Sequence, residues 1–121
     1  MKKKILIVDD EPNIVMSLEY AFKKKDYEVF IARDGTEALE IARLEVPNAI
    51  LLDIMMPKMD GYETIKELRK TKSLQQTKVL FMSAKSKAAD VEKGMQLGAD
   101  SYVTKPFSLK KVITEVEKMI A

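Results

Sequence analysis

Three carboxylates directly follow two short apolar runs in this sequence. Residues 5–8 are followed by Asp9 and Asp10, and residues 49–52 are followed by Asp53. Uninterrupted runs of Ile, Leu and Val are typical of strands covered on both faces of a parallel sheet, and such sheets bind ligands beyond the carboxyl ends of their strands. Three ionised carboxylates in one place repel one another, so we expect a bound cation there, most simply a divalent metal.

A hydroxyl and an ammonium follow two later strand-like runs, in Ser83 and Lys105. Carboxylate oxygens suit Mg²⁺, and a carboxylate can attack phosphorus to form an acyl phosphate whose charge the metal, the lysine and the hydroxyl balance. Asp53 is therefore a candidate nucleophile. Each side chain alone also has a purely structural interpretation: a helix cap for Asp9 and Asp10, a turn hydroxyl for Ser83 and a solvated side chain for Lys105.

The composition excludes several kinds of chemistry. The 121 residues include no cysteine and no histidine, which excludes disulfides, thiol nucleophiles and imidazole catalysis, so any phosphoryl donor must be another molecule. The length suits one domain, predicted to span residues 1–121. No apolar run reaches the ~18 residues of a membrane span, and a net charge of +2 with scattered lysines does not favour nucleic acid. The sequence predicts a cytoplasmic protein without direct nucleic-acid or membrane binding.

Five strand-like segments alternate with five helix-like segments along the chain. Strands are predicted near 4–9, 27–31, 48–52, 78–82 and 101–103, and helices near 13–24, 36–44, 62–70, 88–97 and 108–120. Ser108 is a predicted helix N-cap, and Asp34-Gly35 and Asp60-Gly61 supply turn or cap chemistry between elements. Strict alternation of this kind is typical of α/β proteins with a parallel sheet.

The fourth predicted helix has the weakest apolar face. It offers little more than Val91 and Met95, it contains Gly94, and the polar residues 85–87 precede it. Because few contacts would hold this helix, we expect it to be the element most free to move.

Four blocks of sequence, in order, match a known family. They are Ile5–Glu11, Leu51–Pro57 with Asp60-Gly61 after it, Met82–Ala84, and Gly98–Phe107. Together they closely resemble the receiver domains of two-component response regulators, and the resemblance covers the whole chain. It implies a flavodoxin-like, doubly wound (βα)5 three-layer sandwich with the parallel strand order 2-1-3-4-5.

The resemblance also implies a role for each candidate side chain. Asp53 would be the phosphoacceptor, paired with Lys105 and hydrogen-bonded by Ser83 after phosphorylation. Mg²⁺ would be held by Asp10, by Asp53 and by the backbone carbonyl of Met55, with Asp9 acting through water. The family usually has a cis peptide after this lysine, so the Lys105-Pro106 bond is a candidate for the cis form.

Tyr102 matches the aromatic switch position of the family, although a tyrosine also suits an edge strand for structural reasons alone. In the functional interpretation, Ser83 moves toward the phosphoryl group and Tyr102 rotates into the vacated space. The surface of the fourth helix, fifth strand and fifth helix would then change shape. Met55 and Lys85 flank the approach of water to phosphorus, so they are expected to tune dephosphorylation.

Two departures from the family pattern bear on the oligomeric state and the stability of the domain. Receivers that dimerise in the manner of winged-helix transcription factors commonly carry a ladder of charges at the positions of Val91, Ser101, Lys111 and Glu115, and the ladder is absent here. We therefore expect the phosphorylated domain to stay largely monomeric. Asp26 stands where the family usually has glycine, in a left-handed conformation that aspartate tolerates at a cost of roughly 1 kcal/mol.

The predicted function is phosphorylation-controlled signalling rather than turnover of a substrate. The phosphoryl group would come from a sensor histidine kinase or a phosphotransfer protein, and the switched surface would bind a downstream effector. An aspartate-nucleophile phosphohydrolase would need a second acid at Met55, and a flavin carrier would need a phosphate loop where Asp9, Asp10 and Glu11 repel phosphate. A stand-alone regulator, a relay intermediate and a part of a longer regulator all remain open.

Overall fold

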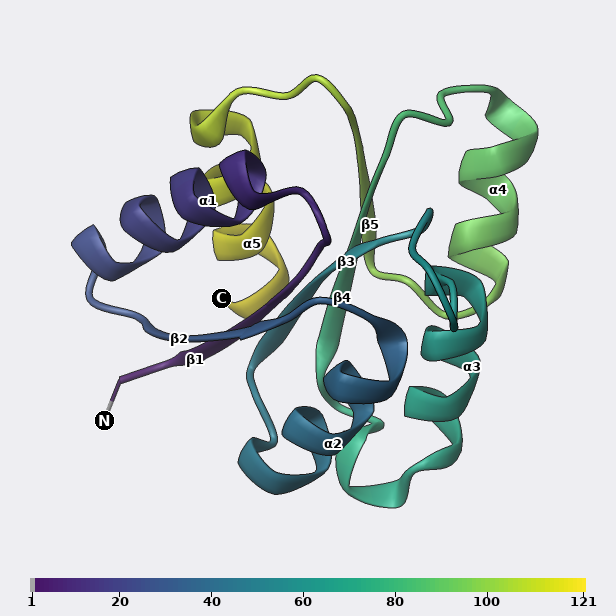
Figure 1. Cartoon of the computed structure of the whole chain (residues 1–121), viewed down its shortest axis with the longest axis horizontal. Helices are drawn as coiled ribbons and strands as arrows, with labels where there is room; N and C mark the ends of the chain where they lie inside the picture. Colours follow the sequence, from purple (N-terminus) through teal and green to yellow (C-terminus); the bar gives the residue numbers. More distant parts are fainter. Residues whose placement is uncertain (1) are drawn as a thin grey trace.

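The protein, described over residues 2–121 in a computed structural model, contains one five-stranded parallel sheet with helices on both faces (Figure 1). The strands lie in the order β2-β1-β3-β4-β5. Their bounds are β1 Lys4–Val8, β2 Glu28–Ala32, β3 Ala49–Asp53, β4 Lys78–Ser83 and β5 Ser101–Thr104. The predicted flavodoxin-like strand order is confirmed.

Within the described residues, four α-helices connect the strands and a fifth follows β5, and the bounds of each helix lie within one residue of the prediction. They are α1 Pro12–Lys24, α2 Gly35–Glu45, α3 Gly61–Lys70, α4 Ala88–Gln96 and α5 Leu109–Ile120. Figure 1 shows α1 and α5 on one face of the sheet and α2, α3 and α4 on the other. A short 3-10 helix, η1 Lys72–Leu74, was not predicted, because one turn carries no hydrophobic period.

The two central strands are buried on both faces, as the apolar runs predicted. Residues 5–8 and 49–52 have no exposed surface. Side chains alternate between the layers: Ile5 and Ile7 pack with α1 and α5, whereas Leu6 and Val8 pack with the helices of the other face. The rigid centre of the sheet therefore carries the residues that follow β1 and β3.

The helix N-termini follow the predicted cap chemistry at three places. Asp34, Asp60 and Ser108 accept hydrogen bonds from the backbone N–H three residues later, at 2.9, 2.9 and 3.1 Å. The first helix differs, because its N-cap is Glu11 and no side chain caps it. The cap interpretation of Asp9 and Asp10 is therefore wrong, because neither carboxylate caps the helix.

The prediction for α4 needs a correction. Met95, assigned to the apolar face, is 42% exposed, and the buried residue of the helix is Gly94. A Cβ built on Gly94 would lie 2.9 Å from the Phe81 ring and 3.2 Å from the Tyr102 ring. The glycine thus permits close packing of α4 on the sheet, whereas sequence reasoning counted it only as a weak point.

Arg69 at the end of α3 joins several loops. Its guanidinium donates to the carbonyls of Thr77 at 2.7 Å and Gly98 at 2.8 Å, and to Asp100 Oδ2 at 3.2 Å. Asp100 Oδ2 also accepts from the backbone N–H of Val79 at 2.9 Å. One side chain therefore fixes the entrance of β4 and the loop that leads into β5.

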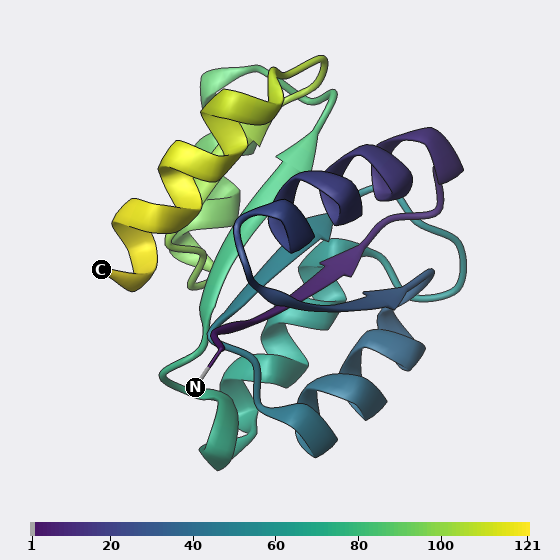
Figure 2. The ribbon, with the colours of Figure 1, turned by 90° about the vertical axis from the view of Figure 1, so that its left-hand side faces the viewer.

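The two chain ends lie at the same end of the sheet, beside the first residues of the strands (Figure 2). Lys3 Nζ donates to the carbonyl of Ile120 at 3.0 Å. We call this end the amino edge and the opposite end, where the strands finish, the carboxyl edge. Within residues 2–121, none of the helices has the length and apolar character needed to cross a membrane.

Candidate functional site at the carboxyl edge

Three carboxylates meet at the carboxyl edge, as the sequence predicts. Val8 pairs with Leu52 in the parallel register, so the residues that follow lie beside each other. Asp9, Asp10 and Asp53 each offer an oxygen within 4.8 Å of the others. Asp9 and Asp53 are buried and Asp10 is exposed, so the cluster has a fixed floor and an open side.

The two oxygens of the Asp9 carboxylate have different partners. Its Oδ1 accepts a hydrogen bond from the backbone N–H of Glu11 at 2.9 Å. Its Oδ2 is buried, and its close partner is the Lys105 ammonium, 3.0 Å away. A buried carboxylate oxygen beside two more carboxylates fits a hard divalent cation held by oxygen ligands.

Lys105 reaches the carboxylates from the loop after β5. Its Nζ lies 3.5 Å from Asp53 Oδ1 and donates to Glu11 Oε1 at 2.9 Å. Burial alone would lower the pKa of Lys105, but the carboxylates of Glu11, Asp9 and Asp53 outweigh burial and raise it. The ammonium therefore stays charged, and the Lys105-Pro106 bond is cis as the resemblance implied.

The ionisation of Asp53 is unfavourable in this environment. The pKa of Asp53 is raised to about 6, chiefly by burial and next by the charge of Asp9, while Lys105 opposes both effects. The small contribution of Asp10 also raises the pKa. The cluster thus stores repulsion that a bound cation would relieve.

Ser83, Lys85 and Tyr102 form one connected group next to the carboxylates. The fully buried Ser83 accepts from the backbone N–H of Lys85 through Oγ at 3.0 Å. The Tyr102 hydroxyl donates to the carbonyl of Lys85 at 2.8 Å, and its ring meets that of Phe81 edge-on at 6.1 Å. The loop after β4 therefore links the Ser83 hydroxyl at the site with the Tyr102 ring, which packs on the face of the sheet that α2, α3 and α4 cover.

A hollow of about 490 Å³ opens beside the cluster. Its lining includes Asp10, Met55, Lys85 and Tyr62. Met55 is 61% exposed there, and Tyr62 has a buried hydroxyl without a hydrogen-bond partner. Sequence reasoning identified Met55 and Lys85 but not Tyr62, because a tyrosine at the start of a helix is expected to be a packing residue.

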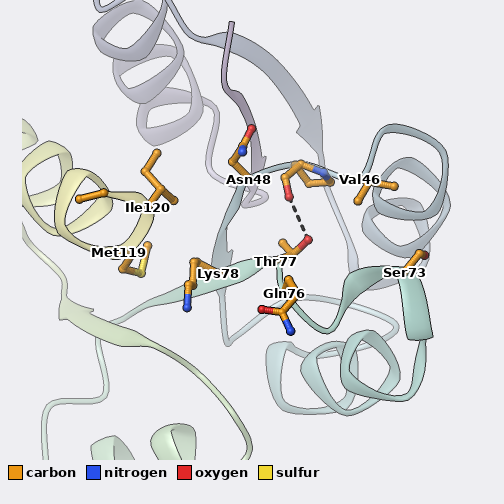
Figure 3. Close-up of a pocket in the computed structure, with 10 residues that line it drawn as sticks. Val46, Asn48, Ser73, Gln76, Thr77, Lys78, Met119 and Ile120 are labelled. Atoms are coloured by element: carbon orange, nitrogen blue, oxygen red, sulfur yellow. Dashed lines mark hydrogen bonds between the residues drawn. The ribbon is translucent and has the colours of Figure 1, made fainter. Parts of the chain in front are cut away.

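A second hollow, of about 340 Å³, lies at the amino edge (Figure 3). The Thr77 hydroxyl there already donates to the carbonyl of Pro47 at 2.9 Å. Lys78 is the only charged side chain among the residues that line it, and none of them carries a side-chain carboxylate. The residues that line this hollow include no cluster of carboxylates, so the carboxyl edge remains the candidate site.

The positions of the missing charge ladder are occupied by a local cluster. Ser101 Oγ donates to Glu115 Oε1 at 2.9 Å. Glu115 Oε2 also lies 3.8 Å from Lys111 Nζ and 3.5 Å from Lys118 Nζ. Hydrogen bonding by Ser101 is the main reason that the pKa of Glu115 is lowered. The carboxylate is thus used within one chain.

The fold and this site together define a doubly wound α/β domain whose carboxyl edge places three carboxylates beside a lysine and a hydroxyl. The family model described as response regulator receiver domain matches residues 5–117. The chain belongs to the receiver domain family of two-component response regulators.

Curated relatives and solved structures agree with this assignment. The chain is 45% identical over 120 residues to the alkaline phosphatase synthesis transcriptional regulatory protein PhoP of Bacillus subtilis, covering 99% of this chain and 49% of that protein. It is also 45% identical over 119 residues to the probable transcriptional regulator ycf27 of Cyanophora paradoxa, covering 98% and 48%. The chemotaxis response regulator CheY4 of Vibrio cholerae superposes with a TM-score of 0.93 at 28% identity, covering 98% and 99%.

These matches confirm the resemblance drawn from the four sequence blocks. The protein is a receiver domain of two-component signalling, and domains of this family receive phosphate from histidine kinases and act on effectors. The chain spans about half the length of the curated relatives it matches.

Proposed function

We propose that this domain accepts a phosphoryl group on Asp53 and thereby switches a surface for binding an effector. The observation that carries the proposal is the position of the Lys105 ammonium, 3.5 Å from Asp53 Oδ1, beside a cluster of three carboxylates whose oxygens lie within 4.8 Å of one another. Such a cluster is prepared for added charge of both signs: a cation against the carboxylates and phosphoryl oxygens against the ammonium.

The transfer is a displacement at phosphorus. An oxygen of the Asp53 carboxylate forms the new bond to phosphorus, and the bond from phosphorus to the imidazole nitrogen of a kinase or phosphotransfer protein breaks. The leaving nitrogen keeps the electron pair, and the product is an acyl phosphate. The chain acts catalytically only on itself, and Lys105 holds positive charge where the phosphoryl oxygens arrive.

Mg²⁺ is the proposed metal because every candidate ligand is a hard oxygen. Asp10, Asp53 and the backbone carbonyl of Met55 would hold it directly, and Asp9 would act through water. When bound, the ion supplies positive charge that screens the carboxylates and the phosphoryl oxygens from one another.

The switch is proposed to run from Ser83 through the loop after β4 to Tyr102. Ser83 Oγ and the Tyr102 hydroxyl are both hydrogen-bonded to the backbone of Lys85. A shift of the serine toward a phosphoryl group would therefore disturb the contact between the Tyr102 and Phe81 rings. The surface formed by α4, β5 and α5 would then change its shape for a downstream effector protein or domain.

The remaining expectations fit this role. We treat residues 1–121 as one receiver domain that works in the cytoplasm, without binding nucleic acid or membrane directly. The residues at the ladder positions support a monomer after phosphorylation, because Glu115 is acidic where the ladder carries a base and its carboxylate is hydrogen-bonded by Ser101. Light scattering with a beryllofluoride mimic tests this, and a tight activation-dependent dimer would contradict it.

Labelling of Asp53 tests the central proposal. Mass spectrometry after incubation with acetyl phosphate and Mg²⁺ should find one added phosphoryl group in the parent and none in Asp53→Asn. Asp34→Asn is a matched control, because asparagine also caps a helix and this residue lies outside the cluster. Undiminished labelling of Asp53→Asn would refute the assignment.

A further inference from the structure

Glu11 makes a contact that its position in the chain does not explain. It occupies the N-cap of α1 in an extended conformation, and the next residue is Pro12. Ser, Thr, Asp and Asn at this position accept hydrogen bonds from backbone N–H groups of the first turn, but Glu11 makes no such bond. Its carboxylate instead accepts from Lys105 Nζ at 2.9 Å, across 94 residues of sequence.

The three carboxylates around Lys105 differ in their freedom to leave. The side chains of Asp9 and Asp53 are 0% and 4% exposed, so both are fixed in the floor of the site. The side chain of Glu11 is 58% exposed and approaches the ammonium from the solvent side. Among the described residues, Glu11 also offers the carboxylate oxygen nearest to Nζ, at 2.9 Å against 3.0 Å for Asp9 and 3.5 Å for Asp53. It is therefore a close partner of Lys105 and the easiest of the three to displace.

An incoming phosphoryl group needs the same ammonium. Its oxygens accept charge-assisted hydrogen bonds, but the three N–H groups of the ammonium already face three carboxylates, those of Glu11 at 2.9 Å, Asp9 at 3.0 Å and Asp53 at 3.5 Å, so a phosphoryl oxygen must displace one of them. We propose that Glu11 is a positioning residue that competes with the phosphoryl group for Lys105, so that phosphorylation requires the exchange of one anionic partner for another. This inference rests on the proposed function, because it concerns the access of a phosphoryl group to Asp53.

Two variants separate competition from simple charge repulsion. Glu11→Gln removes the charge and the ion pair together, whereas Glu11→Asp keeps the charge but is one methylene too short to hold the same contact. Competition predicts faster phosphorylation in both variants, by about two- to fivefold for a partly exposed ion pair. Repulsion of the donor by negative charge predicts faster phosphorylation in Glu11→Gln alone.

The first measurement is the rate of Asp53 labelling at low concentrations of acetyl phosphate, with Mg²⁺ saturating. Glu19→Gln serves as the matched control, because Glu19 lies on α1 and its carboxylate pairs with Lys23 at 2.9 Å rather than with Lys105. The expected result is a parent rate in Glu19→Gln and raised rates in Glu11→Gln and Glu11→Asp. Parent rates in both Glu11 variants, a slower rate in Glu11→Gln, or a raised rate in Glu11→Gln alone would overturn the proposal.

The second measurement does not depend on phosphorylation. Proton–nitrogen NMR of metal-free protein should show slow solvent exchange at the Lys105 ammonium in the parent and in Glu19→Gln, and faster exchange in both Glu11 variants. Equal exchange in all four proteins would show that Glu11 does not hold Lys105. If no protein accepts a phosphoryl group, the proposed function fails, and the NMR comparison still decides whether Glu11 restrains the lysine.

Discussion

The two edges of the sheet differ in how far their polar groups are paired within the chain. At the amino edge, Arg69, Thr77 and Asp100 find partners within the chain, and one arginine bonds carbonyls from separate loops. At the carboxyl edge, three carboxylates crowd together, and burial raises the pKa of Asp53.

The contrast distinguishes residues that stabilise the fold from residues of the candidate site, whose charges a bound counter-ion would balance. A satisfied network lowers the free energy of the folded chain, while a crowded cluster of like charge raises it until a counter-ion binds. The amino edge also carries charged side chains, but Arg69 and Asp100 there are paired with each other. The two edges therefore differ in how completely their charges are balanced within the chain.

The largest effect is expected at the amino edge, from Arg69→Met. The variant leaves the carbonyls of Thr77 and Gly98 and the carboxylate of Asp100 without their shared donor, and we expect the free energy of unfolding to fall by about 3 kcal/mol. Urea denaturation measures the change. The control Lys70→Met, at an exposed surface pair with Glu67, should change stability by less than about 0.5 kcal/mol. A loss below about 1 kcal/mol in Arg69→Met would show that water replaces the arginine freely.

Replacing an aspartate by asparagine should change the free energy of unfolding in opposite directions at the two edges. In the presence of a chelator, Asp53→Asn removes a buried, repelled charge and should raise the free energy of unfolding by about 1–2 kcal/mol. Asp100→Asn should lower it, because the partner of Arg69 loses its charge. Thermal and urea unfolding at pH 7 provide the comparison, and saturating Mg²⁺ should abolish the advantage of Asp53→Asn by stabilising the parent. The same sign at both edges would contradict the contrast.

The lifetime of the phosphorylated state should depend on the rim of the carboxyl edge. The Met55 thioether orients water poorly, and the Lys85 ammonium cannot accept its proton. Met55→Asn combined with Lys85→Glu should speed dephosphorylation about tenfold, which corresponds to about 1.4 kcal/mol of barrier. Loss of label is followed after donor removal with Mg²⁺ saturating. Lys87→Glu, the same charge change in the same loop, is the control, and a double variant slower than the parent would refute this account.

The smallest effect concerns Glu115, at the amino edge beside Ser101. Its pKa is lowered in the folded chain, so it contributes stability above its ordinary pKa of 4.5, and this contribution is lost as pH falls through the lower folded value. Glu115→Gln should lose under about 1 kcal/mol at pH 7, because the ion pairs lie near the surface. Urea unfolding at pH 7 and at acid pH measures this, and a loss that grows as pH falls would have the wrong sign.

The fold was predictable because its signals are local. Buried strands such as residues 5–8 and 49–52 show as apolar runs, and caps such as Asp34, Asp60 and Ser108 stand beside the helices they begin. Gly94 shows the limit of such reasoning. Its low helix propensity is visible in the sequence, but the rings of Phe81 and Tyr102 that require its missing side chain are brought to it only by folding.

The site was predictable where the topology alone brings residues together. Strand ends gave Asp9, Asp10, Asp53, Ser83 and Lys105, because parallel strands deliver their following residues to one edge. Two kinds of contact were missed: the pairing of Glu11 with Lys105, and the carbonyls bound by Arg69. The first joins residues 94 apart through side-chain reach, and the second uses backbone acceptors that every residue has, so neither leaves a pattern in the sequence.

Lys3 donates a hydrogen bond to the carbonyl of Ile120, so the two ends of the domain lie together at the amino edge. Other sequence can be joined before or after the domain without covering Asp53, which lies a five-residue strand away, about 16 Å at the usual rise. The same distance means that, if Asp53 is phosphorylated as proposed, sequence joined at the amino edge is affected only by way of the helices and loops between the two edges.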